Sequence, residues 1–309
     1  MTPDTFATKP VVAERARQLG EVGTAWLTEL PDLIRTLERR WSIVVGPQLS
    51  DGNSAYVANA RTSTGVDVVL KIPVPDGVAP RQLKTLTAAA GRGYVRVLES
   101  DPEHYALLLE RLGPSVNRAG LSVDDQITTM AAMLVRAWQV PRDPTEPAFD
   151  KARSLAELTA GLWEAQARPC SERVLQRALD YADRRSAAFD PDRCVVVHGD
   201  PGPPNALQVL TPRPGAEVGY VFVDPDGFVG DPTYDLGVVL RDFCTELLAG
   251  DTVALARHYC GLLAASSGHD EAAIWEWGFM ERVSTGLYAR SLGLEALGRQ
   301  FLAVAEALV

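Results

Sequence analysis

Hydrophobic positions change their spacing near Trp41, where a helical pattern gives way to short β-prone runs. Over residues 11–40, apolar side chains recur three and four positions apart, which predicts helix, and Pro31 is expected to mark a turn or a new helix start. The runs that follow are separated by turn-forming residues such as SDGN and TSTG. The predicted strands cover residues 42–49, 55–61, 66–72, 94–99 and 105–110, with one helix at 80–90 between the third and the fourth. The pattern indicates an antiparallel, mainly β first lobe.

Beyond this lobe the pattern becomes mainly helical. Residues 112–120, rich in Gly, Pro and Asn, break both periods and are interpreted as the connection between two lobes. Helices are predicted at residues 123–138, 154–168, 172–188 and from 234 to the end, and strands at 194–198, 206–210 and 218–224. The sequence thus predicts an α+β fold in two parts. Residues 1–112 form an N-terminal helical segment plus a β-rich lobe, and residues 113–309 form a mainly helical lobe.

Charge and composition exclude several classes of protein. The chain of 309 residues carries 30 Lys and Arg against 40 Asp and Glu, a formal net charge of −10. That balance argues against nucleic acid or an anionic membrane surface as a partner, since both attract basic proteins. The longest apolar runs fall far short of the roughly 20 residues of a membrane span, and the first residues lack the apolar stretch of a signal peptide. The four cysteines form no Cys-x-x-Cys pair, so we expect a reduced, cytoplasmic protein.

Candidate chemistry is concentrated in residues 195–235. Asp200 closes an apolar strand, Asn205 returns to the same strand end after a proline-rich loop, and Asp224 closes the next hairpin. In phosphoryl transfer a carboxylate orients the attacking hydroxyl, while an amide oxygen and a second carboxylate hold Mg²⁺ on the nucleotide phosphates. Each residue alone is explained as a turn residue. Together, H-x-D-x-x-x-x-N and a later strand-closing Asp have the spacing of a kinase catalytic loop.

A lysine in the β-rich lobe is consistent with that chemistry. Lys71 ends the apolar run VVLK, the context in which kinases place the lysine that contacts the nucleotide phosphates. The alternative is an edge-strand lysine that aids solubility. The turn at residues 50–54, which includes Ser54, would cover the phosphates with backbone N–H groups, although it lacks G-x-G-x-x-G spacing.

With these residues the sequence resembles the aminoglycoside phosphotransferase family, antibiotic kinases that share the protein-kinase fold. The matching residues are His198-Gly199-Asp200 with Asn205, Val223-Asp224, and Gly230-Asp231-Pro232 with Tyr234-Asp235-Leu236. The segment AWLTELPDLIRTLERRW is most similar to the streptomycin 6-kinase branch, which also includes hydroxyurea kinases. The resemblance implies a bilobal protein-kinase-like fold with a small antiparallel-sheet N-lobe and a mainly helical C-lobe.

The resemblance also implies roles for individual residues. Asp200 would be the catalytic base, Asn205 and Asp224 the Mg²⁺ ligands, and Lys71 the partner of the α- and β-phosphates of ATP, with GTP left open as the donor. It further implies a hinge that meets the adenine (Glu110, Arg111, Leu112) and structural roles in and after the catalytic loop (His198, Asp231, Asp235).

Two departures from the family pattern affect these expectations. The family's lysine pairs with a glutamate on the following helix, but no acidic residue occurs between Asp76 and Glu99. The catalytic loop reads Pro-Gly-Pro-Pro at residues 201–204, where the family often has a polar side chain. The first departure puts nucleotide binding in doubt, and the second removes side-chain contacts from the loop.

The acceptor is expected to be a small, cationic molecule. Residues 231–309 hold eleven Asp and Glu against five Arg, and carboxylates suit an amine or guanidine through charge-assisted hydrogen bonds. The candidate substrate residues are Asp226, Asp242, Glu246, Glu276 and Glu281, with solvated helix faces as the alternative for each.

The favoured hypothesis is an ATP- and Mg²⁺-dependent O-phosphotransferase acting on an aminoglycoside of the streptomycin type. The alternatives are a kinase of a metabolite such as an amino sugar or of another antibiotic class, and a pseudokinase-like nucleotide-binding module. The hydroxyl modified and the oligomeric state stay open, because the fold alone does not decide them.

Overall fold

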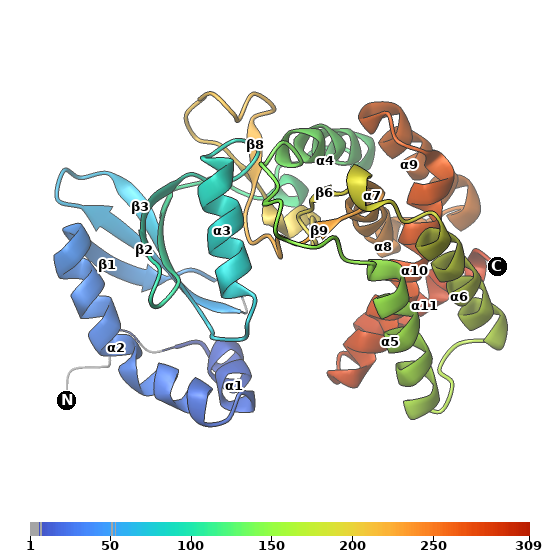
Figure 1. Cartoon of the computed structure of the whole chain (residues 1–309), viewed down its shortest axis with the longest axis horizontal. Coiled ribbons are helices and arrows are strands. Elements are labelled where there is room, and N and C mark those ends of the chain that lie inside the picture. The colour runs from blue at the N-terminus through green and yellow to red at the C-terminus, as the bar shows by residue number, and fades with distance from the viewer. Residues whose placement is uncertain (1–5, 7, 51, 53) are drawn as a thin grey trace.

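The first lobe is built on an antiparallel sheet, and the rest of the chain is mostly helical (Figure 1). The computed structural model describes residues 6, 8–50, 52 and 54–309. The sheet has the order β1-β2-β3-β5-β4. Its strands are β1 (Ile43–Gln48), β2 (Ala55–Thr62), β3 (Asp67–Pro73), β4 (Val97–Asp101) and β5 (Ala106–Glu110), with α3 (Ala79–Ala89) between β3 and β4. The predicted α+β, kinase-like fold class is confirmed.

One expectation about the N-terminal helical segment was wrong. The break between α1 (Pro10–Gln18) and α2 (Glu21–Trp41) falls at Gly20, whose φ is +69°, and Pro31 lies inside α2. Proline within a helix costs about 3 kcal/mol, because the amide hydrogen is missing and the ring crowds the preceding turn. Leu30, Ile34 and Leu37 of α2 are almost completely buried against the sheet. Burying such side chains contributes about 1.5–3 kcal/mol each, so their packing outweighs the proline.

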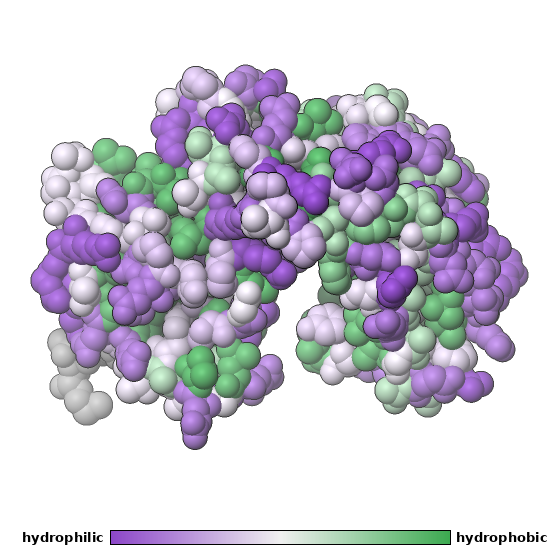
Figure 2. Space-filling view, viewed as in Figure 1, coloured by the Kyte–Doolittle hydropathy of each residue, from purple (hydrophilic) through white to green (hydrophobic). Residues whose placement is uncertain are grey.

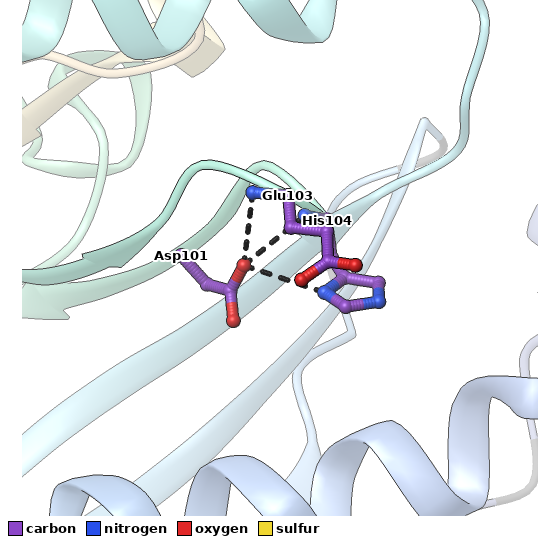
Figure 3. Close-up of side chains that lie close together, drawn as sticks. All are labelled: Asp101, Glu103 and His104. Atoms are coloured by element: carbon purple, nitrogen blue, oxygen red, sulfur yellow. Dashed lines mark hydrogen bonds and ion pairs between the residues drawn. The ribbon is translucent and has the colours of Figure 1, made fainter.

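The turn between β4 and β5 is closed by one aspartate (Figure 3). Asp101 Oδ1 accepts hydrogen bonds from the backbone N–H groups of Glu103 (3.0 Å) and His104 (3.2 Å). Its other oxygen pairs with Arg40 of α2 at 2.8 Å. The three side chains of Asp101, Glu103 and His104 lie close enough to hold a cation. Because both oxygens of Asp101 are already engaged, the cluster is explained as a turn that ties the hairpin to α2.

The second lobe is organised around α10 (Glu271–Ser291), which is buried on nearly every side. Its helices include α4 (Val123–Ala137), α5 (Lys151–Ala165), α6 (Glu172–Ala187), α7 (Pro232–Arg241), α8 (Cys244–Ala249), α9 (Thr252–Ser267) and α11 (Glu295–Ala307). Two short ladders carry the loops between the lobes: β6 (Val195–Val196) with β9 (Val229–Gly230), and β7 (Ala206–Gln208) with β8 (Tyr220–Phe222). The observed strands β6, β7 and β8 are shorter than the strands predicted at residues 194–198, 206–210 and 218–224.

The hydrophobic core is continuous between the lobes. Leu86 and Tyr94 of the first lobe belong to the same buried cluster as Phe222 and Ile127 of the second. The sheet's other face packs on α2 in a separate cluster. Within the described residues, no helix is both long and apolar enough to cross a membrane. The continuous packing under the sheet sets the relative position of the loops that carry the polar residues described next.

Candidate active site

A cavity of about 390 Å³ lies where the two lobes meet, and six of the predicted site residues line it. Figure 2 shows the molecular surface notched between the lobes. The lining residues predicted from the sequence are Ser54, Lys71, Asp200, Asn205, Asp224 and Asp226. Residues from the sheet therefore face residues from the two short ladders of the second lobe.

The loop after β6 holds Asp200 and Asn205 by backbone contacts. Gly199 has a φ of +92°, and a Cβ there would lie 2.6 Å from the Cβ of Asp226, so the position requires glycine. The Asn205 side-chain amide donates to the Asp200 carbonyl at 2.9 Å, and the Asn205 backbone N–H donates to Gly202. With its NH₂ group used in this way, Asn205 presents its side-chain oxygen as an acceptor. The proline-rich loop thus returns the amide to the same cavity wall as Asp200.

Asp224 lies in a conformation that aspartate seldom adopts. Its φ is +59°, and such left-handed backbone outside glycine costs of the order of 1–3 kcal/mol and is concentrated at functional sites. The flanking Val223 is fixed by its N–H, which donates to the Asn205 carbonyl at 2.9 Å. The Asp224 carboxylate meets Lys71 at 2.5 Å, and the lysine side chain is only 4% exposed. A carboxylate from one lobe and an ammonium from the other therefore meet across the cavity.

His198 and Asp235 act as a buried support for the catalytic loop. His198 Nε2 lies 2.9 Å from the Val223 carbonyl, and its Nδ1 accepts the Asp200 N–H at 3.2 Å, which defines a neutral imidazole. Burial lowers the pKa of His198 to about 4, against the opposing effect of Asp200. Asp235 accepts the N–H groups of His198 and Gly199, both at 2.8 Å, and burial raises its pKa to about 7.

Asp231, the third residue predicted to be structural, caps a helix. Its side chain accepts the Thr233 N–H at the start of α7, and its second oxygen accepts the indole N–H of Trp277 at 3.2 Å. It therefore connects α7 to α10, the central helix of the lobe.

The helix expected to carry a glutamate presents a glutamine instead. Gln82 of α3 lines the cavity and is largely buried. The ion-pair partner of Lys71 is Asp224, which lies on the other lobe. α3 is nevertheless held against the site, because Gly227, at a φ of +65°, allows its backbone to approach Thr85 closely. The missing glutamate thus leaves the lysine paired and the helix in place.

Arg241, at the end of α7, contacts the site and was not predicted from the sequence. Its guanidinium pairs with Asp200 (Nη2–Oδ1, 3.0 Å), Asp242 (Nε–Oδ1, 3.2 Å) and Glu281 (Nη1–Oε2, 3.3 Å). Burial alone would lower the pKa of Arg241, but the three carboxylates raise it well above its ordinary value. The only signal in the sequence is the Arg-Asp pair after the apolar run 236–240, which is also typical of a solvent-facing helix end.

The five candidate acceptor residues are dispersed. Asp242 and Glu281 are neutralised by Arg241, and Glu276 pairs with Arg184 (3.1 Å) and Arg185 (2.6 Å) of α6, not with the cavity. Glu246 lies exposed on α8. Asp226 alone of the five lines the cavity, and its pKa is raised by burial and by Asp200.

The predicted adenine-binding hinge does not line the cavity. The side chain of Glu110 pairs with Arg213 and accepts the Arg96 N–H at 2.7 Å, so it braces the start of the interlobe connection. Leu112 is buried in the core, and Arg111 is half-buried. Within the predicted phosphate-covering turn, residues 51 and 53 lie outside the described part of the chain, whereas Gly52 and Ser54 line the cavity. Adenine binding by the hinge stays a prediction.

Two lobes, a lysine–carboxylate pair across the cleft, and an Asp and an Asn on one facing loop define a kinase-like phosphotransferase. The family model described as aminoglycoside/hydroxyurea antibiotic resistance kinase matches residues 40–293. The chain belongs to this family, and it is an ATP-dependent small-molecule phosphotransferase.

Individual relatives are similar over most of their length. The chain is 28% identical over 304 residues to streptomycin 6-kinase from Streptomyces glaucescens, covering 97% of this chain and 96% of that one. It is 29% identical to hydroxyurea phosphotransferase from Kitasatospora aureofaciens, covering 97% and 84%. The fold is shared with an aminoglycoside phosphotransferase from Streptomyces rimosus solved with ADP and streptomycin, at a TM-score of 0.53 and 19% identity over 83% of this chain and 98% of that chain.

Proposed function

We propose that this protein transfers the γ-phosphoryl group of ATP to a hydroxyl of an aminoglycoside of the streptomycin type, with Mg²⁺. The observation that supports it best is the convergence of Lys71, Asp224, Asn205 and Asp200 on one cavity. The similarity to streptomycin 6-kinase supports the acceptor class. A kinase of hydroxyurea or another antibiotic is the second candidate, supported by the similar identity to hydroxyurea phosphotransferase.

Asp200 is placed to act on the acceptor. Its carboxylate is about half exposed and lies on the cavity wall, where it would orient the attacking hydroxyl and accept its proton. The Arg241 contact holds that carboxylate in position. Lys71, whose largely buried side chain lines the same cavity, would contact the phosphates of the donor.

The oxygen atoms that face Lys71 across the cavity fit a hard divalent cation. A carboxylate from Asp224 and an amide oxygen from Asn205 are the oxygen ligands that Mg²⁺ prefers, and two protein ligands plus phosphate oxygens complete a usual site. When bound, the ion supplies charge stabilisation to the transferring phosphoryl group. Asp224 would exchange Lys71 for the ion in part, which a carboxylate that is strained and 35% exposed permits.

The charges around the cavity refine the acceptor expectation. Arginines already neutralise Asp242, Glu276 and Glu281, so a cationic acceptor would be recognised mainly by Asp226. A site with one unpaired carboxylate tolerates both weakly charged and cationic acceptors, which is why the second candidate is retained.

The test is a panel of acceptors with γ-labelled ATP. Streptomycin should become labelled by the wild-type protein and remain unlabelled with Asp200→Ala, while that variant still binds Mg·ATP in a thermal-shift titration. Labelling of hydroxyurea or an amino sugar in place of streptomycin would contradict the favoured acceptor. Full turnover by Asp200→Ala would contradict the catalytic assignment.

A further inference from the structure

The N-terminal helix α1 lies outside the segment that the family model matches, yet it reaches the cavity. The matched segment begins at residue 40, whereas α1 spans Pro10–Gln18. In Figure 1 this helix lies at the end of the first lobe, below α3 and beside the space between the lobes. Two of its side chains contact two different loops that line the cavity.

Lys9, at the start of α1, anchors the turn between β1 and β2. Its ammonium donates to the Ser50 carbonyl at 2.7 Å and lies 3.5 Å from the Gly52 carbonyl. Gly52 and Ser54 of this turn line the cavity beside Lys71. The Lys9 ammonium therefore holds two carbonyls of a turn that also lines the cavity.

Arg15, two turns further along α1, lines the same cavity. Its guanidinium pairs with Asp76 Oδ2 at 2.6 Å, and Asp76 Oδ1 accepts the Val78 N–H at 3.2 Å before α3. Arg15 is 47% exposed, so it remains accessible to a ligand while it is paired.

The position of α1 is set by packing. Val12 and Ala16 are fully buried and form a small apolar cluster with Val74, which follows β3. Since β3 also carries Lys71, the helix is fixed directly to the strand that provides the predicted phosphate ligand. This buried face holds Arg15 beside the cavity even though the guanidinium itself is partly in solvent.

The lining of the cavity is more acidic than basic, so binding an anionic nucleotide requires a positive charge in addition to Lys71. Among its described lining residues, the basic ones are Arg15 and Lys71, against the carboxylates of Asp76, Asp200, Asp224 and Asp226. Lys71 is already engaged by Asp224. A triphosphate is strongly anionic, and arginine binds phosphate oxygens through two parallel N–H groups.

We infer that α1 is part of the nucleotide site: Arg15 exchanges Asp76 for the terminal phosphates of the bound nucleotide, while Lys9 holds the covering turn over them. The inference rests on the proposed phosphotransfer function and adds a phosphate ligand from outside the matched family segment. A cationic acceptor is disfavoured beside a guanidinium, so Arg15 is assigned to the donor.

The test measures the affinities of the full chain for adenosine, AMP, ADP and ATP with Mg²⁺ by calorimetric titration. Arg15→Met should leave the affinity for adenosine unchanged and weaken the affinity for ATP about tenfold. Arg15 would contact only the phosphates, through a charge-assisted hydrogen bond, and adenosine has none. Lys9→Met should weaken ATP by a smaller factor, about threefold. Arg17→Met is the matched control: it lies on the same helix, pairs with Glu14 and should bind all four ligands as the wild type does.

Asp76→Asn separates a phosphate contact from a structural ion pair. The asparagine keeps the acceptor for the Val78 N–H but frees the guanidinium, so ATP affinity should be equal to or tighter than that of the wild type. Loss of ATP affinity in Asp76→Asn equal to that in Arg15→Met would overturn the inference, as would wild-type ATP affinity in Arg15→Met. If the wild type itself fails to bind Mg·ATP, the proposed function fails instead, so the two failures are distinguishable.

Discussion

Two regions of the second lobe use carboxylates in different ways. The loops that carry Asp200 and Asp224 line the cavity and are called the loop wall, whereas the helical wall, at the end of α7 and on α10, lies behind it and contacts it through Arg241. On the loop wall, Asp200 and Asp224 are held by backbone contacts within a segment of some 40 residues and point into the cavity. On the helical wall, Asp242 and Glu281 are paired with Arg241 and so are largely neutralised. Asp200 and Asp224 are paired too, with Arg241 and Lys71, but their side chains stay 54% and 35% exposed, against 20% and 5% for Asp242 and Glu281. The difference shows that a paired carboxylate indicates a binding site when it remains accessible to a ligand.

The largest effect is expected on the loop wall, at Asp224. Asp224→Asn keeps the shape of the side chain but removes the charge that pairs with Lys71 and that, as we propose, would bind the metal ion. We expect kcat to fall by about a thousandfold, as for loss of a charged group acting on the transferring phosphoryl group. Steady-state assays over a range of Mg²⁺ concentrations test this. A variant that retains wild-type kcat at saturating Mg²⁺ would place the metal elsewhere.

The second effect concerns the helical wall. Arg241→Met leaves Glu281 and Asp242, which are 5% and 20% exposed, without their partner, and breaking a buried pair in this way costs about 3–5 kcal/mol of unfolding free energy. Arg184→Met removes an exposed partner of Glu276, which keeps its second partner Arg185 at 2.6 Å, so it should cost less than about 1 kcal/mol. Urea unfolding of both variants provides the measurement. Equal losses in the two would mean that Arg241 does not balance the helical wall.

The buried His198, which supports the loop wall, should make the free energy of unfolding depend on pH. The pKa of His198 is lowered by burial from 6.5 to about 4, so on acidification the unfolded state takes up the proton first. Its stabilising contribution is complete above pH 6.5 and is lost as the pH falls to 4, by about 3 kcal/mol. The difference in unfolding free energy between wild type and His198→Gln should therefore shrink by that amount between pH 7 and pH 4. A difference that stays constant with pH would show that His198 is not held neutral.

The smallest effect separates the acceptor candidates. Asp226→Asn should raise the KM for streptomycin about tenfold, because Asp226 is the one of the five candidate acceptor residues that lines the cavity. Glu246→Gln, an exposed change on α8, should leave that KM within about twofold. Acceptor titrations at saturating ATP test the pair. An equal rise in both variants would implicate the helical wall after all.

The sequence alone predicts the loop wall better than the helical wall. The positions of Asp200, Asn205 and Asp224 could be predicted because short, glycine- and proline-containing loops fix them locally. The helical course of α2 through Pro31 could not, because packing against the sheet overrides the local cost.

Ion pairs between residues far apart in the sequence could not be predicted either. Arg241 meets Asp200 and Glu281 from about 40 residues away on either side, and no local pattern encodes that meeting. Arg15 reaches the cavity from a helix whose sequence indicates only an amphipathic surface. Local spacing thus predicts the chemistry of the loops, while the charge state of the walls depends on tertiary contacts.

The most direct test of convergence at the loop wall is a crystal structure with a non-hydrolysable ATP analogue and Mn²⁺, located by anomalous scattering. We expect the ion to be bound by the Asp224 carboxylate and the Asn205 side-chain oxygen at about 2.1 Å, with the γ-phosphate facing Asp200. A metal ion held by other residues, with the analogue away from Lys71, would contradict the account.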